Sequence, residues 1–420
     1  MEIKLLGEPN FDSPINYSVD ENVRVPEHIV RTLEQPAREG LLFELAGPRK
    51  KLFFDPEHSR AGIVTCGGLC PGLNDVIRSL FLELHHAYGV KEVLGFLEGY
   101  KGLDPVRGRE PIVLTSSLVD DIHKEGGTIL NTSRGPVDMS LAVDNLIKRG
   151  INILFTVGGD GTQRGGVALF QEAQKRGYPL SVVGIPKTID NDVAYVSRTF
   201  GYLTAVEEAM KVLERAHTEA HSVENGISLV KLMGRNAGFI AAGATVASQE
   251  VNFTLVPEVP FKLNGPKGFL EALKARVLDR SHALIVVAEG AGQELLEQNE
   301  VVRDASGNIK TGDIGLFLRQ KIELYFKEQN IPMVMRYIDP SYLIRSSPAN
   351  AEDSILCDLY ARHAVHAAMA GKTGVVIGYL HNQFVHVPVE LVTSQKKSMK
   401  PESFVWRAVL STTGQAERFE

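Results

Sequence analysis

The sequence predicts an α/β protein with two doubly wound lobes, mainly parallel sheets, an active-site crevice between the lobes and an N-terminal extension. Two observations predict this fold: short apolar runs alternate with helical stretches from Arg60 onward, and glycine-rich turns follow several of these runs. Strands that alternate with helices form parallel sheets that helices cover on both faces. At one domain per ~150 residues, a chain of 420 residues has room for two or three lobes. A crevice between such lobes is the default ligand site.

Four segments are expected along the chain. Residues 1–58 carry six prolines and little periodicity, which predicts an extension that wraps a neighbouring surface and holds short helices at best. Residues 59–202 form the first lobe, which residues from about 346 to 395 complete. Residues 203–345 form the second lobe, and residues 396–420 form a C-terminal segment.

The first lobe alternates predicted strands with amphipathic helices. The helix after the first strand places Val76, Leu80 and Leu84 on one face, which is the spacing of a helix that packs against a sheet. The predicted strands are 61–65, 90–96, 151–157 and 180–185, and the predicted helices are 73–88, 141–149 and 165–176.

The same alternation continues in the second lobe and beyond it. The predicted strands are 226–232, 252–256, 283–288, 331–337 and 373–380, and the predicted helices are 204–217, 237–247, 268–279, 314–329 and 349–370.

Composition narrows the class of function. Lys and Arg number 45 against 51 Asp and Glu, and the resulting net charge of −6 does not support general electrostatic binding to nucleic acid. No apolar run is long enough for a membrane span, and residues 1–17 lack the apolar core of a signal peptide. Three cysteines are too few, and odd in number, for a disulfide framework. We therefore expect a cytoplasmic protein with no nucleic-acid or membrane partner.

Two glycine-rich turns follow predicted strands, at Gly67-Gly68 and at residues 158–162. Glycine lets backbone N–H groups approach phosphate oxygens, and the helix after each turn adds its positive end. Neither turn matches the phosphate loop of nucleotide hydrolases or the dinucleotide-binding pattern. Asp160 in the second turn suits Mg²⁺ held against a polyphosphate, or a cap for the next helix. Two such turns in one lobe favour a phosphate site.

A third polar segment, residues 186–192, follows another strand and should start at the same edge of the sheet as Asp160. In an extended stretch Asp190 and Asp192 face the same side. Two carboxylates on one side of a cleft suit a general base beside a supporting acid, and a polar turn is the alternative. Lys187 adds positive charge, so the functional interpretation is favoured.

Several arginines lie in glycine-rich contexts or at strand ends, where they are better placed for phosphate than an ordinary surface arginine. Arg134 lies in a loop of small residues, and Arg235 follows a predicted strand. The pair Lys396-Lys397 is interpreted as a short solvated charge run.

In combination these motifs resemble the phosphofructokinase family over residues 61 to 380. The first motif and the long extension look most like the ATP-dependent branch of plants and trypanosomes. The motifs are Gly67-Gly68-x-x-Pro71-Gly72-Leu73-Asn74, Gly158-Gly159-Asp160-Gly161-Thr162, Pro186-Lys187-Thr188-Ile189-Asp190-Asn191-Asp192, Met233-Gly234-Arg235 and Asp339-Pro340-Ser341-Tyr342-Leu343-Ile344-Arg345.

The resemblance implies a kinase that transfers the γ-phosphoryl group of ATP, with Mg²⁺, to the 1-hydroxyl of fructose 6-phosphate. It implies Asp190 as general base, with Asp192, Arg235 and Lys187 as further catalytic residues, and Asp160 as the Mg²⁺ ligand. The first lobe would hold the phosphate donor through Gly68, Arg134, Gly135, Gly159, Asp160, Gly161 and Thr162. The sugar phosphate would contact Thr188, Ile189, Asp190, Met233, Gly234, Arg235, Glu289, Arg336, Tyr342 and Arg345, mainly from the second lobe.

The resemblance also implies an assembly of identical subunits. Arg336 matches a family arginine that reaches the 6-phosphate from a neighbouring subunit, which implies a homotetramer or at least a dimer. The sequence departs from the bacterial ATP enzyme at Leu69-Cys70, at Gly226 and at Tyr342, where that enzyme has an Asp-Ala pair, a second cross-subunit arginine and a histidine. These departures weigh against allosteric control of the bacterial type.

The phosphate donor depends on position 161. Pyrophosphate-using relatives carry an aspartate there, in the space of the ATP α-phosphate, whereas this chain has Gly161 and so permits ATP. Lys187 is typical of pyrophosphate users, so a pyrophosphate-dependent enzyme is the alternative. A non-catalytic regulatory paralogue is a second alternative, which intact Asp160, Asp190 and Arg235 argue against.

Overall fold

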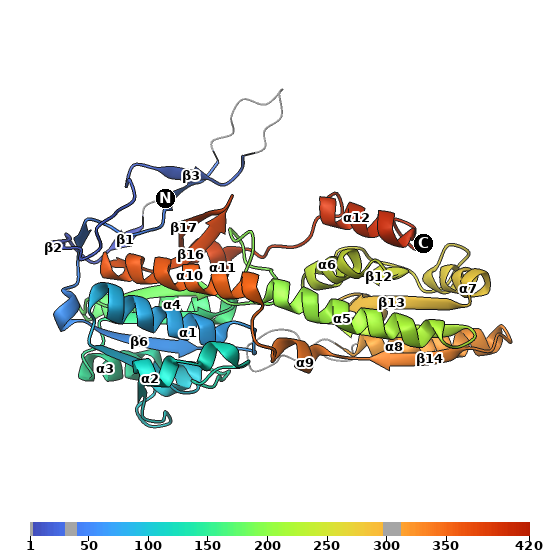
Figure 1. The fold of residues 1–420 in the computed structure, drawn as a ribbon, viewed down its shortest axis with the longest axis horizontal. Coiled ribbons are helices and arrows are strands. Elements are labelled where there is room, and N and C mark those ends of the chain that lie inside the picture. Colours follow the sequence, from blue (N-terminus) through green and yellow to red (C-terminus); the bar gives the residue numbers. More distant parts are fainter. Residues whose placement is uncertain (1–2, 30–39, 297–311) are drawn as a thin grey trace. The chain divides into compact units, whose positions relative to one another are not determined.

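A computed structural model describes residues 3–29, 40–296 and 312–420 as a mixed α/β protein with two main sheets (Figure 1). The chain divides into two compact units, each with one of these sheets. The first unit comprises Met1–Thr188, Val193–Gly201 and Ser346–Lys396, and the second comprises Ile189–Asp192, Tyr202–Arg345 and Lys397–Glu420.

The main sheet of the first unit has nine strands within the described ranges, in the order β3-β4-β17-β16-β10-β9-β6-β7-β8. The five strands from β16 to β7 run parallel to their neighbours, and the strands at both margins are antiparallel. The strands are β3 (Arg24–Pro26), β4 (Leu42–Leu45), β6 (Arg60–Thr65), β7 (Glu92–Phe96), β8 (Ile112–Val113), β9 (Ile153–Gly158), β10 (Ser181–Pro186), β16 (Val375–Leu380) and β17 (Gln383–Pro388).

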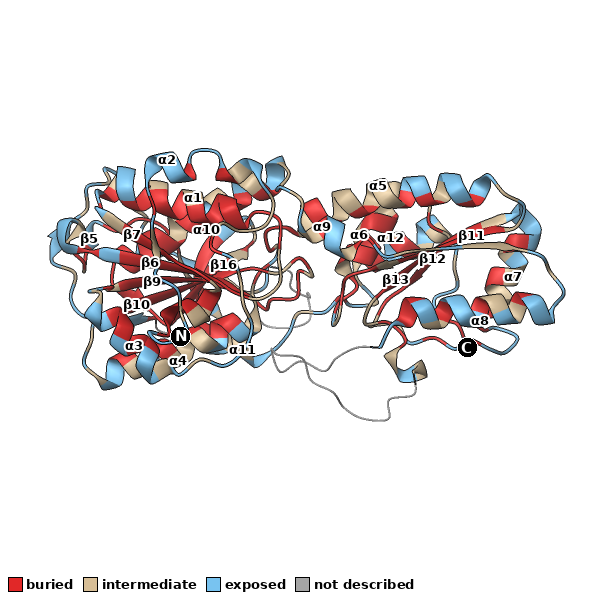
Figure 2. Ribbon diagram, turned by 90° about the horizontal axis from the view of Figure 1, so that it is seen from below, coloured by how far each residue is buried: buried red, intermediate tan, exposed pale blue. Residues whose placement is uncertain are grey.

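Helices cover both faces of this sheet. Figure 2 shows α1 (Leu73–Leu82) and α10 (Ala351–Met369) on one face, and α3 (Met139–Lys148), α4 (Asp160–Lys175) and α11 (Val389–Ser394) on the other. All six residues of β9 are buried, which explains their continuous apolar run, because a strand covered on both faces has no solvent side.

The second unit has a four-stranded sheet in the order β12-β13-β11-β14, in which every neighbouring pair is parallel. Helices α5 and α6 lie on one face, and α7 and α8 lie on the other (Figure 2). None of the helices in the described ranges combines the length and the apolar character that crossing a bilayer requires. The elements are β11 (Gly226–Leu232), β12 (Phe253–Leu255), β13 (His282–Ala288), β14 (Val334–Ile338), α5 (Tyr202–His221), α6 (Phe239–Ser248), α7 (Phe269–Arg280) and α8 (Ile314–Glu328).

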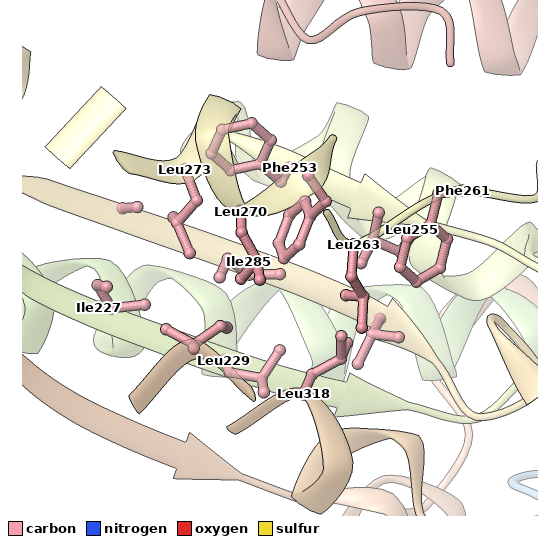
Figure 3. Packing of buried hydrophobic residues seen from close by; sticks show 14 of the residues in the cluster. Ile227, Leu229, Phe253, Leu255, Phe261, Leu263, Leu270, Leu273, Ile285 and Leu318 are labelled. Atoms are coloured by element: carbon pink, nitrogen blue, oxygen red, sulfur yellow. The ribbon is translucent and has the colours of Figure 1, made fainter. Parts of the chain in front are cut away.

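The core of the second unit includes a residue from the end of the chain. Figure 3 shows Phe253, Ile285 and Leu318 among the apolar side chains between this sheet and its helices. Phe419 belongs to the same cluster, with its ring centre 5.6 Å from that of Phe269. Burying a side chain of this size contributes roughly 1.5–3 kcal/mol. The C-terminal segment is therefore anchored to the second unit.

The α/β class is confirmed, and all predicted strands are present with ends shifted by a few residues. The sheet of the first unit is less uniformly parallel than expected, because β8 and β17 pair antiparallel with their neighbours and short strands of the N-terminal extension continue the sheet beyond β17. For residues 1–58 we predicted short helices at best, but the described residues there form mainly short β-strands. Apart from the short turn Pro56–His58, the described residues there form β1 (Lys4–Leu5), β2 (Phe11–Asp12), β3, β4 and β5 (Lys51–Leu52).

A buried ion network holds β4 of the extension to the body of the first unit. Glu44 accepts from Arg49 Nη2 at 2.5 Å, and Lys372 Nζ lies 2.8 Å from the same carboxylate oxygen. Arg49 and Lys372 are 3% and 6% exposed. Burial alone would raise the pKa of Glu44, but His386 and Lys372 outweigh it and hold that pKa well below its usual 4.5. Glu44 is therefore ionised at neutral pH.

Replacing Glu44 with Gln is expected to lower the free energy of unfolding by about 3–5 kcal/mol, because two buried cations would lose their shared counter-charge. Chemical denaturation at pH 7 measures this loss. Since the folded-state pKa of Glu44 is depressed, its contribution is present above pH 4.5 and is lost as the pH falls below that value. The exposed Glu8→Gln variant is the matched control, and equal stability of the two variants would contradict the assignment.

Candidate active site

Three strand ends lie side by side in the first unit. Strands β6, β9 and β10 are neighbours, with Thr65 paired to Val157 and Gly158 paired to Pro186. The loops that follow them therefore begin at one edge of the sheet. The prediction that the segment from Lys187 starts beside the strand that leads to Asp160 is confirmed.

Lys187 joins the first two of these loops. Its backbone N–H donates to the Gly158 carbonyl oxygen at 3.0 Å, and its Nζ donates to the Gly68 carbonyl oxygen at 2.5 Å. Gly67 has a φ of +89°, and a Cβ there would lie 3.3 Å from Lys187 Nζ, so glycine suits this turn. The lysine is 6% exposed, and its side chain brings a positive charge to the first turn while its backbone contacts the second.

Asp160 opens helix α4, which begins five residues before the predicted helix at 165. The glycines on either side of Asp160 have a low helix propensity and hide this start in the sequence. A carboxylate in the first turn is stabilised by the positive end of the helix. Its Oδ2 lies 3.4 Å from Lys396 Nζ, a cation that the sequence analysis placed in solvent.

Asp160 fits a role as a Mg²⁺ ligand. Mg²⁺ is commonly held by one or two carboxylates, with phosphate oxygens and water completing its shell. Among the described residues, no three His, Cys, Asp or Glu side chains are arranged to hold a metal by themselves. A Mg²⁺ ion on Asp160 would complete its shell with phosphate oxygens and water.

The remaining predicted donor residues surround the same turns. Gly67 N–H donates to the Ser133 carbonyl oxygen at 3.3 Å, which brings the loop of Arg134 and Gly135 to the first turn. Thr162 is 6% exposed and its side chain packs against Gly158. It supports the second turn from within.

In the second unit, Arg235 and Glu289 follow neighbouring parallel strands. Leu232 at the end of β11 is paired with Ala288 at the end of β13, and Glu289 N–H donates to the Leu232 carbonyl oxygen at 2.8 Å. A Cβ at Gly290 would lie 1.9 Å from the Arg235 carbonyl oxygen, so only glycine permits this approach. Gly234 has a φ of +125°, which also favours glycine.

Asp190 joins this cluster and is electrostatically perturbed. Burial raises the pKa of its carboxyl, and the nearby carboxylates of Asp192 and Glu289 raise it further. The backbone N–H and the positive charge of Arg235 act in the opposite direction, but the net shift is upward. Burial also raises the pKa of Glu289. A carboxyl pKa raised from the usual aspartate value toward neutrality suits a general base, which must accept a proton from the acceptor hydroxyl and release it again.

Other predicted sugar-phosphate residues are more dispersed. Met233 and Ile189 are buried. Arg336 is opposite Ser228, before the end of β11, and its exposed side chain pairs with Glu219 at 3.0 Å. It is therefore not brought to the cluster of Asp190, Arg235 and Glu289.

Tyr342 and Arg345 lie together on the short helix α9 (Ser341–Arg345). The guanidinium carbon of Arg345 is 4.4 Å from the centre of the Tyr342 ring.

The prediction that Lys396 and Lys397 form a solvated charge run was wrong for Lys397, whereas Lys396 is exposed. Lys397 is half-buried, and its Nζ donates to Asn191 Oδ1 at 3.0 Å. The two residues are 206 positions apart in the sequence, so no local pattern could reveal this contact. The only sequence signal was the apolar content of the segment after it, which includes Trp406 and Phe419.

Comparison with known proteins agrees with these features. The Phosphofructokinase family model matches residues 60–368. An ATP-dependent 6-phosphofructokinase of Borreliella burgdorferi is 45% identical, over 99% of this chain and 96% of the relative. ATP-dependent 6-phosphofructokinase 7 of Arabidopsis thaliana is 45% identical over 98% of this chain and 84% of its own.

A further relative and a solved structure are also similar to this chain. The ATP-dependent 6-phosphofructokinase of Trypanosoma brucei brucei is 46% identical over 89% of this chain and 76% of its own. The crystal structure of a pyrophosphate-dependent phosphofructokinase from Marinobacter aquaeolei has the same fold, with a TM-score of 0.70 at 21% identity over 86% of this chain and 93% of its own. The chain therefore belongs to the phosphofructokinase family.

Proposed function

We propose that this protein is an ATP-dependent 6-phosphofructokinase, which converts fructose 6-phosphate to fructose 1,6-bisphosphate. The observation that carries the proposal is 45% identity, over 99% of the chain, to a relative named as an ATP-dependent 6-phosphofructokinase. The residues of the two strand-end clusters supply the chemistry that phosphoryl transfer requires.

The second unit would provide the acceptor site. Asp190 takes the proton from the 1-hydroxyl of the sugar as its oxygen forms a bond to the γ-phosphorus, and ADP leaves as the bond to its β-phosphate oxygen breaks. The raised pKa of Asp190 makes it a stronger base than an ordinary aspartate. Arg235, beside Glu289, is positioned to neutralise charge that develops during transfer.

The first unit would hold the donor. The Gly67-Gly68 and Gly158-Gly159 turns offer backbone N–H groups to phosphate oxygens, and Lys187 Nζ lies at the first of these turns. Asp160 would hold Mg²⁺, which when bound neutralises phosphate charge. A homo-oligomer is also proposed, supported by the exposure of Arg336, the residue that the resemblance assigns to a contact with a neighbouring subunit.

A pyrophosphate-dependent enzyme is the second candidate, and Lys187 is the residue that favours it. We expect purified protein with Mg²⁺ and fructose 6-phosphate to form the 1,6-bisphosphate with ATP at a kcat/KM at least tenfold above that with pyrophosphate. Coupling the product to aldolase measures both rates. A higher kcat/KM with pyrophosphate would show that pyrophosphate, and not ATP, is the phosphate donor. No turnover with either donor would instead indicate a regulatory paralogue.

A further inference from the structure

The start of the C-terminal segment contacts the predicted catalytic loop within the second unit. Lys397 N–H donates to the Asp192 carbonyl oxygen at 3.0 Å, and Lys397 Nζ donates to Asn191 Oδ1 at 3.0 Å. One lysine thus binds two consecutive residues that directly follow Asp190. Because one bond comes from the backbone and one from the side chain, both the path of the segment and the lysine itself constrain the loop.

The segment is held firmly on its other side. Met399 is 2% exposed, and its N–H donates to Glu258 Oε1 at 2.9 Å. The same carboxylate accepts from Gly238 N–H at 3.0 Å, at the start of helix α6. Lys397 Nζ also lies 5.2 Å from the centre of the Phe239 ring, the first residue of that helix. Lys397 therefore connects a rigid helix start to the loop.

The loop has a conformation that benefits from such support. Asn191 has a φ of +54°, in the left-handed region, and its side chain is 5% exposed. Asparagine tolerates this region better than most residues, but it remains less favourable than an ordinary backbone conformation. A change of the backbone angles at Asn191 would redirect the acids on both sides of it. The bond from Lys397 to the Asn191 side chain opposes that change.

The charges around Lys397 agree with this arrangement. Burial lowers its pKa to about 7, and the carboxylate of Asp192 opposes that shift. Asp190 in turn interacts with Asp192, Glu289 and Arg235. A cation beside Asp192 offsets part of the repulsion between the carboxylates of this loop. Neighbouring Lys396 differs, since it is exposed and pairs with Asp160 in the first unit.

We infer that Lys397 is a positioning residue for the phosphoryl-transfer reaction, which holds the Asn191-Asp192 turn so that Asp190 presents its carboxylate to the acceptor hydroxyl. The inference rests on the proposed role of Asp190 as general base. Lys397 acts on this loop through its bonds to Asn191 Oδ1 and to the Asp192 carbonyl oxygen.

Replacement of Lys397 by Met tests the inference in the full-length protein. We expect kcat to fall about 10- to 100-fold, since small displacements of a catalytic group have effects of this size, with the KM for ATP within twofold of the wild type. The Lys397→Arg variant retains a donor and a charge, and should keep more activity than Lys397→Met. The exposed Lys400→Met variant is the matched control and should have wild-type kinetics.

The pH profile separates positioning from a general loss of structure. Without the cation beside Asp192, the loop carboxylates ionise less readily, so the acid limb of kcat/KM should move to higher pH in Lys397→Met. A destabilised but correctly arranged protein would show fewer active molecules and an unchanged limb.

A double-mutant comparison provides a second measurement. Glycine adopts the left-handed conformation without strain, so in an Asn191→Gly background the Lys397→Met change should cost less than in the wild type. Wild-type kcat and pH profile in Lys397→Met, or an effect confined to the KM for ATP, would overturn the inference. If Asp190→Asn remained active, the proposed base itself would be wrong. If Asp190→Asn were inactive while Lys397→Met behaved as wild type, only the positioning role would fail.

Discussion

Replacing Asp190 with Asn is expected to lower kcat by about 10²- to 10⁴-fold, the usual contribution of a general base. Asparagine keeps the shape of the side chain and can still accept a hydrogen bond from Arg235 N–H, but it cannot take a proton from the sugar hydroxyl. Steady-state rates with saturating ATP and fructose 6-phosphate measure the loss. Asp279→Asn, at an exposed aspartate of helix α7, is the matched control.

The same substitution should have the opposite effect on stability. Burial and neighbouring carboxylates raise the pKa of Asp190 in the folded state, so folding favours its protonated form. The stability that this provides is complete below the unfolded pKa of 3.8 and is lost as the pH rises through the folded pKa. Asp190→Asn has no carboxyl group to ionise, so it avoids the loss of stability that ionised Asp190 causes at alkaline pH. We therefore expect an inactive variant with a raised melting temperature at pH 9.

These two readouts distinguish the possible roles of Asp190. If the Asp190 carboxylate had only a structural role, its replacement would lower the stability and would lower kcat only moderately. A buried general base is expected to lower the stability of the protein, because the same burial that makes its ionised form unfavourable also raises its basicity. Its replacement should therefore raise stability and abolish activity. Retention of more than a tenth of the wild-type kcat in Asp190→Asn would exclude the general-base assignment.

The parts of the fold that were predicted correctly are those whose pattern is local. The buried run of β9 and the alternation of strands and helices from β6 to β13 follow directly from short-range hydrophobic spacing. The sequence also predicts that Asp160 and Lys187 lie at the same edge of the sheet, because neighbouring parallel strands end on the same side.

The missed features depend on distant parts of the chain. Strand β4 is placed by its pairing with β17 and by the contact of Glu44 with Lys372, which no window around residue 44 contains. The start of α4 could not be predicted, because the glycines on either side of Asp160 have a low helix propensity. Lys397 looked like surface charge, since a lysine pair has no periodicity that could indicate burial.

Replacing Gly161 with Asp is expected to lower kcat/KM for ATP by several hundredfold or more. The resemblance to pyrophosphate-using relatives implies that an aspartate at this position would lie in the space of the ATP α-phosphate. Two like charges ~4 Å apart repel by ~4 kcal/mol at an effective dielectric of ~20, and each ~1.4 kcal/mol is a factor of ten in affinity. Pyrophosphate has no corresponding group, so its use should be affected far less.

The fold should tolerate this change, so a loss of ATP use can be assigned to the donor site. In the described part of the chain, apart from the neighbouring residues and the backbone of α4 itself, a Cβ at Gly161 would meet Arg164 Nη2 alone within 4 Å, at 3.9 Å. Gly161 is the second residue of α4. An aspartate in a first helical turn is stabilised by the helix dipole, and Arg164 offers a further opposite charge. The melting temperature of Gly161→Asp is therefore expected to equal or exceed that of the wild type.

Gly161→Asn separates charge from bulk, because asparagine has nearly the volume of aspartate and no charge. If repulsion decides the donor, Gly161→Asn should keep most of the ATP activity that Gly161→Asp loses, and raising the salt concentration should partly restore the latter. Equal losses in both variants would instead mean that ATP needs the empty volume beside the start of α4. Wild-type ATP kinetics in Gly161→Asp would show that position 161 does not face the donor, and donor choice would then rest on Lys187 and the first glycine turn.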